Sequence, residues 1–278
     1  MEMKYRTVIA DIDGTITKKG EPPMEVTRQA LIRCHEAGMD VGLATGRPLD
    51  HRIFDRAKVW DLGFSFDVLI GMNGGELWDR YTDKIEREYM LDEDTLREIL
   101  GFMMDLDVNA IIFADGYDYV KATRTDRQLE SSIRRNKSRV EFVAPEELCR
   151  APACKLEFHY DVSIEEELYR VIDAHKDPRW TAVRTFPGTI EFMDPRVDKG
   201  SALRKYCTHA GIAPAEVIAC GDMENDIGMM KEAGLGVCLL NGSEAARSAA
   251  DCVTDYPVAE DGLGRWFFKT VFSENHEF

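Results

Sequence analysis

Val-Ile-Ala-Asp-Ile-Asp-Gly-Thr, residues 8–15, joins a short apolar run to two carboxylates that are two residues apart. The apolar run predicts a buried strand over residues 7–10, and both aspartates follow the point where that strand ends. Side chains two residues apart on an extended segment point to the same side, so Asp11 and Asp13 should lie together. Carboxylates this close repel each other and favour a divalent cation, a shared proton, or both. The stretch therefore predicts metal-assisted chemistry on a phosphoryl group, with one aspartate attacking and the other handling the proton.

Strand and helix patterns alternate on both sides of the middle of the chain. The expected strands are 40–44, 68–71, 217–220, 235–239 and a short one near 253–254. The expected helices are 25–37, 48–57, 200–210, 224–233 and 243–250. Alternation of this kind predicts an α/β fold with a doubly wound, Rossmann-like parallel sheet. In such sheets ligands bind beyond the carboxyl ends of the strands.

The middle of the chain has a looser, mixed pattern. We expect a helix over 92–104, a hairpin of strands 108–113 and 117–121, a strand over 155–160, a helix over 164–175, and strands near 180–184 and 189–193. This pattern predicts an α+β domain inserted into the α/β core. We place the core in residues 1–82 and 193–278 and the insert in residues 83–192.

Charge and composition limit the partners. The net charge of −16 disfavours nucleic acid as the main partner, although a metal and local cations can still bind a small phosphorylated molecule. No stretch approaches the roughly 18 apolar residues of a membrane helix, and the first residues lack a signal-peptide pattern, so we expect no membrane partner. The seven cysteines show no C-x-x-C spacing and indicate reduced thiols in a cytoplasmic protein. The oligomeric state stays open.

Four separate segments place polar residues where an expected strand ends or a helix begins. They are Asp11 with Asp13, Thr45-Gly46-Arg47, Lys199-Gly200, and Gly221-Asp222 with Asn225-Asp226. A parallel sheet would bring all four to one edge. The carboxylates of Asp11 and Asp222 and the carbonyl oxygen of Asp13 could then bind Mg²⁺. Lys199 and the hydroxyl of Thr45 could hold phosphoryl oxygens.

In this order the segments resemble the four motifs of the haloacid dehalogenase superfamily of phosphohydrolases. Three further runs, residues 199–203, 225–229 and 73–75, are similar to its Cof-like branch, which carries a large C2-type cap domain (subclass IIB). The resemblance covers the core, and the insert matches only in size and position. It implies a phosphatase core of the superfamily's fold with the insert as its cap.

The resemblance also implies a role for each motif residue. Asp11 would attack phosphorus and form an aspartyl-phosphate, and Asp13 would protonate the leaving oxygen and then activate water. Asp222 would be the second carboxylate on the metal. Asp226 would support the metal's water ligands or Lys199.

The substrate contacts have structural alternatives. The candidate substrate-binding residues are Thr45, Gly46, Arg47, Asn73 and Asn225. Arg47 could equally pair with surface carboxylates, and Asn73-Gly74 is in its own right a strong hairpin signal. Lys199 could be an exposed lysine, although a helix start is unfavourable for a cation.

Two features of the insert also have both a functional and a structural interpretation. The segment 121–139 carries seven cations against two acids, and it is either a site for an anionic substrate or, as we favour, a solvated helix face. We expect a structural role for His159.

Together these observations predict a Mg²⁺-dependent phosphatase of a small phosphorylated metabolite, either a sugar phosphate or a nucleotide- or cofactor-type phosphate. The insert would act as a lid that chooses the leaving group, with hinges near 81–83 and 193–194. A phosphotransferase or phosphosugar mutase of the same superfamily is the first alternative, because water and alcohol acceptors use the same aspartates. A non-catalytic regulator that binds a phosphorylated metabolite is the second.

Overall fold

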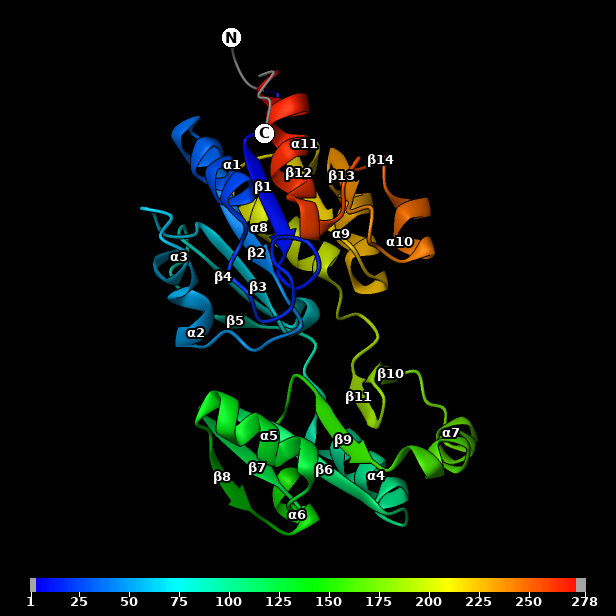
Figure 1. The fold of residues 1–278 in the computed structure, drawn as a ribbon. Helices are drawn as coiled ribbons and strands as arrows, with labels where there is room; N and C mark the ends of the chain where they lie inside the picture. Colours follow the sequence, from blue (N-terminus) through cyan, green and yellow to red (C-terminus); the bar gives the residue numbers. More distant parts are fainter. Residues whose placement is uncertain (1–3, 274–278) are drawn as a thin grey trace. The chain divides into compact units, whose positions relative to one another are not determined.

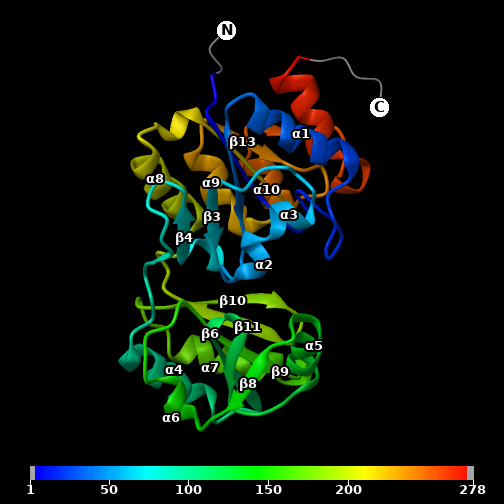
Figure 2. The ribbon, with the colours of Figure 1, turned by 90° about the vertical axis from the view of Figure 1, so that its left-hand side faces the viewer.

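The computed structural model describes residues 4–273, and the chain forms two compact units (Figures 1 and 2). The core unit runs up to Glu86 and resumes at Asp198, and the insert unit is Arg87–Val197. The boundaries placed from the sequence, 82 and 193, lie four and five residues before 86 and 198. Among the described residues, no helix has the length and apolar character needed to cross a membrane.

The core unit is built on an eight-stranded sheet in the order β14-β13-β12-β1-β2-β3-β4-β5. Its strands are β1 (Thr7–Asp11), β2 (Asp40–Ala44), β3 (Val68–Gly71), β4 (Glu76–Asp79), β5 (Glu86–Arg87), β12 (Val217–Gly221), β13 (Leu235–Cys238) and β14 (Cys252–Val253). β1 pairs in parallel with both β2 and β12, and the parallel run extends to β3 and β14. The predicted parallel sheet is confirmed. β4, which pairs antiparallel with β3, and β5 were not predicted.

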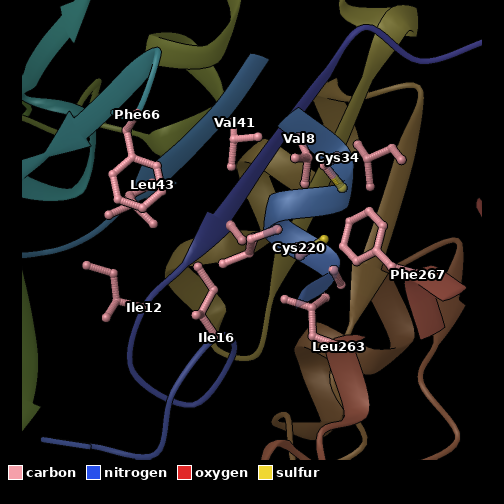
Figure 3. Packing of buried hydrophobic residues seen from close by; sticks show 14 of the residues in the cluster. Val8, Ile12, Ile16, Cys34, Val41, Leu43, Phe66, Cys220, Leu263 and Phe267 are labelled. Atoms are coloured by element: carbon pink, nitrogen blue, oxygen red, sulfur yellow. The ribbon is translucent and has the colours of Figure 1, made fainter. Parts of the chain in front are cut away.

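Helices cover both faces of this sheet. They are α1 (Glu25–Glu36), α2 (His51–Phe54), α3 (Arg56–Val59), α8 (Lys199–Ala210), α9 (Ile227–Glu232), α10 (Glu244–Ala249) and α11 (Gly262–Trp266). Alternate residues of β1 serve opposite faces of the sheet. Val8 packs with Cys34 of α1 and Leu263 of α11 (Figure 3). Ile9 packs in a different cluster with Leu203 of α8. The sheet is therefore doubly wound, as predicted.

Two helices begin differently from the prediction. The segment 48–57 forms the short helices α2 and α3 rather than one helix. Asp50 caps the start of α2 by accepting a hydrogen bond from the backbone N of Arg52, and the backbone of Asp55, with ψ at −1°, interrupts the helix between α2 and α3. The segment 224–233 starts as a 3₁₀ turn, Glu224–Asp226, and only then becomes α9.

The turn after β3 brings two distant segments together. Asn73 and Gly74 both have positive φ, 57° and 108°, and they lead from β3 into the antiparallel strand β4, which confirms the predicted hairpin. A Cβ on Gly74 would lie 2.3 Å from the carbonyl oxygen of Asp198, so only glycine lets this turn approach the start of α8.

The insert unit contains a six-stranded sheet in the order β10-β11-β9-β6-β7-β8. Its strands are β6 (Val108–Tyr117), β7 (Tyr119–Ala122), β8 (Arg139–Phe142), β9 (Leu156–Tyr160), β10 (Thr181–Phe186) and β11 (Thr189–Met193). Its helices are α4 (Glu93–Met103), α5 (Arg127–Asn136), α6 (Pro145–Leu148) and α7 (Glu165–Ala174). Leu96 of α4 and Leu168 of α7 pack with Phe158 in one apolar cluster, and Leu129 of α5 packs with Ile111 in another.

Part of the insert differs from the prediction. β6 runs on through residues 114–117, where we expected the turn, because a bulge between Phe113 and Asp115 lets the strand pairing continue. β8 and α6 were not predicted, and α5 was expected only as a solvated helix face within segment 121–139, without bounds. Their sequences lack a clear apolar period, since α5 buries only Leu129 and β8 buries no residue.

Candidate active site

Lys199, the first residue of α8, is completely buried between two carboxylates. Its Nζ donates hydrogen bonds to Asp11 Oδ1 at 2.7 Å, to Asp226 Oδ1 at 2.6 Å and to the Ala44 carbonyl oxygen at 3.2 Å. These partners follow or end β1, β12 and β2, so the neighbouring parallel strands β12-β1-β2 assemble the group at their carboxyl ends. The alternative that Lys199 is an exposed helix-start lysine is wrong.

The opposite charges of Lys199 and the two carboxylates stabilise one another. Burial by itself would lower the pKa of Lys199, but the attraction of Asp11 and Asp226 holds it above its ordinary value. Burial raises the pKa of Asp11 to about 8 although Lys199 opposes the shift, and burial raises the pKa of Asp222 to about 6. One ammonium group therefore does not compensate the buried carboxylates, and a further cation would stabilise their ionised forms.

Asp226 uses both of its carboxylate oxygens inside the protein. Oδ1 accepts from Lys199, and Oδ2 accepts from the backbone N of Asp222 at 2.9 Å and of Met223 at 3.0 Å. Asp226 thus fixes both the ammonium group and the loop that carries Asp222. Of the two alternatives for Asp226, this geometry matches support of Lys199.

Asp222 lies against the loop that follows β1. Its Oδ1 accepts a hydrogen bond from Thr15 Oγ1 at 2.8 Å. Gly14 has a φ of +102°, and a Cβ there would lie 2.2 Å from Asp222 Oδ2. Gly14 is thus required both by its backbone conformation and by the close approach of the carboxylate.

The carboxylates form a candidate metal site. Oxygen atoms of Asp11, Asp222 and Asp226 lie within 4.8 Å of one another. Oδ1 of Asp11 accepts a hydrogen bond from Lys199, and Oδ1 of Asp222 accepts one from Thr15. Among the described residues, the Oδ2 atoms of both aspartates therefore remain available to bind a cation. An all-oxygen donor set of this kind fits a hard cation such as Mg²⁺. That the Asp13 carbonyl joins them stays a prediction.

Asp13 is paired with Arg47. The Arg47 Nη2 donates to Asp13 Oδ2 at 2.5 Å, and both side chains are about a third exposed, 32% for Arg47 and 28% for Asp13. The backbone N of Arg47 also donates to Thr45 Oγ1 at 3.3 Å. Arg47, for which we left a surface pairing open, therefore binds a candidate catalytic carboxylate instead.

The remaining candidate substrate contacts also gather at this edge. Asn225 Nδ2 donates to Asn73 Oδ1 at 3.1 Å, and Gly46 is so close to Asn73 that a Cβ there would lie 3.0 Å from the same oxygen. Thr45 is buried directly after β2, where its backbone N donates to the Ile70 carbonyl at 2.8 Å. The structure brings these residues together, and their contact with a substrate stays a prediction.

Asn241 was missed from the sequence, and no structural role was predicted for Gly200 and Gly228. Asn241 donates through Nδ2 to the Gly14 carbonyl at 2.9 Å and accepts at Oδ1 from the backbone N of Val258 at 2.7 Å. Gly200 and Gly228 let α8 and α9 touch, because a Cβ on Gly200 would lie 2.7 Å from the Gly228 backbone. Both glycines lie inside the motif runs quoted above, so the sequence did point to these positions. No motif contains Asn241.

In the insert unit, His159 is held between two carboxylates. Its Nδ1 lies 2.9 Å from Asp126 Oδ2 and its Nε2 lies 3.0 Å from Glu157 Oε1. Asp126 caps α5 by accepting from the backbone N of Gln128 and Leu129. These contacts fit the structural role that we expected for His159.

The cationic segment 121–139 is mostly solvent-facing. Arg124 pairs with Asp107 at 2.6 Å and Arg134 with Glu130 at 3.8 Å. Three more of its cations are exposed around α5: Arg127, Arg135 and Lys137. The pattern agrees with the solvated helix face that we favoured.

Comparison with known proteins is consistent with this geometry. The family model of haloacid dehalogenase-like hydrolases matches residues 8–267. A 5-amino-6-(5-phospho-D-ribitylamino)uracil phosphatase of Bacillus subtilis is 27% identical over 265 residues and is covered to 95%, as is this chain. A phosphoglycolate phosphatase of Methanopyrus kandleri is 30% identical over 266 residues, with 92% of each chain covered.

The fold is also shared with a solved structure. A haloacid dehalogenase-like hydrolase from Bacteroides thetaiotaomicron superimposes with a TM-score of 0.82 at 23% identity, covering 96% of this chain and 99% of the other. This similarity shows that the two proteins share the same fold. The chain therefore belongs to the family of haloacid dehalogenase-like hydrolases, as its motifs indicated, and its enzyme class is that of the phosphatases.

Proposed function

We propose that this protein hydrolyses phosphate monoesters of small metabolites through an aspartyl-phosphate on Asp11, with Mg²⁺ held by Asp11, Asp222 and the Asp13 carbonyl. The observation that carries the proposal is the buried ammonium group of Lys199, 2.7 Å from Asp11 Oδ1. A buried cation beside a nucleophile neutralises charge on the phosphoryl group as it is transferred. The bound Mg²⁺ would withdraw further charge from the same group.

The reaction needs two groups with different tasks. An oxygen of Asp11 attacks phosphorus while the bond to the leaving oxygen breaks, and Asp13 gives that oxygen a proton. Asp13 then takes a proton from water, which attacks the aspartyl-phosphate, restores Asp11 and releases inorganic phosphate. Lys199, held by Asp226, keeps Asp11 oriented through both steps.

Arg47 and Thr45 would serve the substrate from the strand next to β1. Arg47 pairs with Asp13 at 2.5 Å, so its guanidinium group lies where an incoming phosphoryl group would meet the proton donor. We propose that Arg47 and the Thr45 hydroxyl bind phosphoryl oxygens and that Gly46, Asn73 and Asn225 border the same site.

The substrate is proposed as a class. The two relatives described above are named for a phosphorylated ribitylaminouracil and for phosphoglycolate, which are both small phosphorylated compounds. We propose a sugar phosphate or a nucleotide- or cofactor-type phosphate, with the insert, residues 83–192, selecting the leaving group. The seven cysteines are free thiols, which supports the cytoplasm as the compartment.

Phosphate release tests the proposal. Wild type and Asp11→Asn are incubated with a panel of phosphorylated metabolites, in Mg²⁺ and in EDTA, with exposed Asp105→Asn as the matched control. We expect release only with Mg²⁺, loss of at least a thousandfold in Asp11→Asn, and no change in Asp105→Asn. An isomeric phosphate as product would favour the transferase, and equal rates in wild type and Asp11→Asn would overturn the mechanism.

A further inference from the structure

The peptide groups on both sides of Gly14 are held by hydrogen bonds. The Gly14 backbone N donates to the Thr17 carbonyl oxygen at 2.7 Å, and the Gly14 carbonyl oxygen accepts from Asn241 Nδ2 at 2.9 Å. Gly14 has a φ of +102°, and a glycine by itself leaves both of its peptide groups free to rotate. The course of the loop after β1 therefore depends on these contacts, and of the two the one from Asn241 comes from outside the loop.

The orientation of Gly14 also sets that of the Asp13 carbonyl, the proposed metal ligand. The peptide group that joins Asp13 to Gly14 is planar, so the Asp13 carbonyl points away from the Gly14 N–H and hence away from Thr17. A shift of Gly14 would turn the Asp13 carbonyl with it, because the two belong to one peptide plane. The contact that holds Gly14 thus acts on the carbonyl of the preceding residue.

The segment that carries Asn241 also contacts the backbone of Asp222. The backbone N of Ser243 donates to the Asp222 carbonyl oxygen at 2.8 Å, and a Cβ on Gly242 would lie 2.8 Å from the same oxygen. This short segment therefore reaches both loops that contribute proposed metal ligands, the loop of Gly14 after β1 and that of Asp222 after β12. Asn241 is thus placed to set the spacing between them.

The two neighbours of Asn241 require a side chain with both a donor and an acceptor. Oδ1 accepts from the backbone N of Val258 at 2.7 Å, while Nδ2 meets the Gly14 carbonyl. An N–H only donates and a carbonyl oxygen only accepts, so the carboxamide fits in one orientation. The preceding residue is held as well, since the Leu240 backbone N donates to Thr254 Oγ1 at 3.0 Å. Asn241 therefore holds Gly14 from a support that is itself hydrogen-bonded.

We propose that Asn241 is a positioning residue for the metal, which keeps the Asp13 carbonyl and the Asp222 carboxylate at the spacing that Mg²⁺ requires. The inference rests on the proposed function, because it assumes that Mg²⁺ binds between these two ligands. Mg²⁺ demands nearly ideal octahedral geometry, so a small displacement of one ligand weakens its binding. Removing a partner that orients a metal ligand typically lowers metal affinity by about 10- to 100-fold.

Titration with Mg²⁺ tests the proposal. The dissociation constant of Mg²⁺ is measured by calorimetry and by the rise in Tm for wild type, Asn241→Leu and Asn241→Asp. The first variant keeps the size of the side chain without either hydrogen bond, and the second keeps the acceptor for Val258 but loses the donor for Gly14. Leu240→Ala, which shortens an exposed side chain of the same loop, is the control. Tm in EDTA shows whether each variant keeps its fold.

We expect both variants of Asn241 to bind Mg²⁺ about 10- to 100-fold more weakly than wild type, and Leu240→Ala to bind it equally well. Asn241→Asp is the decisive variant, because an added negative charge by itself would tighten the binding of a cation. The Mg²⁺ concentration for half-maximal phosphate release should rise by the same factor. Saturating Mg²⁺ should largely restore kcat, because the ligands themselves are intact.

Two results would overturn the inference: Mg²⁺ binding in Asn241→Asp as tight as in wild type or tighter, or no Mg²⁺ binding in wild type. A lower Tm in EDTA with an unchanged dissociation constant in the first of these cases would assign Asn241 a purely structural role. If wild type binds Mg²⁺ but releases phosphate from no compound, the proposed function fails by itself. The dissociation constants then still decide the role of Asn241.

Discussion

Lys199 and Asp226 form a 2.6 Å ion pair in which both side chains are buried, although 27 residues separate them in the chain. The pair joins the start of α8 to the turn that precedes α9, and it holds Lys199 against Asp11. A buried ion pair contributes little net stability but is costly to break, because the remaining partner is a buried charge without compensation. The arrangement of the site therefore depends on both members being present.

A double-mutant cycle on this pair should show strong coupling. Lys199→Met leaves two buried carboxylates without their cation, and we expect a loss of about 3 kcal/mol in the free energy of unfolding. Lys199→Met/Asp226→Asn should lose less than the sum of the single variants, with a coupling of about 1 kcal/mol or more. Urea unfolding of the four proteins measures it. Strict additivity would contradict the pair.

Mg²⁺ should stabilise the core unit. A ligand that binds only the folded state at 100 times its Kd adds about 2.7 kcal/mol, so Tm should rise with Mg²⁺ and fall back with EDTA. Asp222→Asn should lose this response, and it should be more stable than wild type without metal because one repelling charge is gone. Asp105→Asn should respond like wild type. A full Mg²⁺ response in Asp222→Asn would place the metal elsewhere.

Two glycines with positive φ offer a matched comparison. At Gly14 (φ +102°) a Cβ would lie 2.2 Å from Asp222 Oδ2, whereas at Gly20 (φ +81°) a Cβ would have no atom of residues 4–273, its two chain neighbours aside, within 4 Å. Alanine is strained at both, by about 1–2 kcal/mol. Only Gly14→Ala should also displace Asp222 and lower phosphate release at least 100-fold. Equal activity of the two variants would show that the contact is unimportant.

The insert unit should lose stability as the pH rises. Burial opposes the charge on His159, but the hydrogen bonds that its ring N–H groups donate to Asp126 and Glu157 outweigh burial and raise the pKa of His159 to about 9. Because this lies above the unfolded value of about 6.5, the stabilisation is complete below pH 6.5 and is lost as the pH rises through 9, by about 3 kcal/mol.

Hydrogen exchange measured by mass spectrometry on β9 follows this loss within the insert. Protection should fall from pH 6.5 to 9 after correction for the intrinsic exchange rate. His159→Gln should flatten that dependence, and His175→Gln, at an exposed histidine of the same unit, should retain it. A wild-type dependence in His159→Gln would assign the effect to another group.

The sequence predicted the strands that carry the site with greater success than the surrounding structure. The bounds of β2 and β3 agree with the prediction because both strands are apolar runs buried on both faces. The bounds of α5 were not predicted, because its contacts are largely polar, through Asp126 at its cap and Gln128 to Gly188 and Thr189, and such contacts leave no periodic signal.

In the site, too, the sequence predicted single residues better than the contacts between them. The sequence indicated Lys199 and Asp226 as functional residues, but their contact depends on the approach of two helices and could not be read from local patterns.

Gly200 of α8 and Gly228 of α9 leave room for the Asp198 carboxylate. A Cβ on Gly200 would lie 2.7 Å from Asp198 Oδ2 and from the Gly228 backbone, and a Cβ on Gly228 would lie 1.9 Å from Asp198 Oδ1. A side chain at either position would therefore push α8 and α9 apart or displace the carboxylate that caps α8. Because Lys199 follows Asp198 and Asp226 directly precedes α9, the 2.6 Å distance between ammonium and carboxylate depends on two residues that have no side chain.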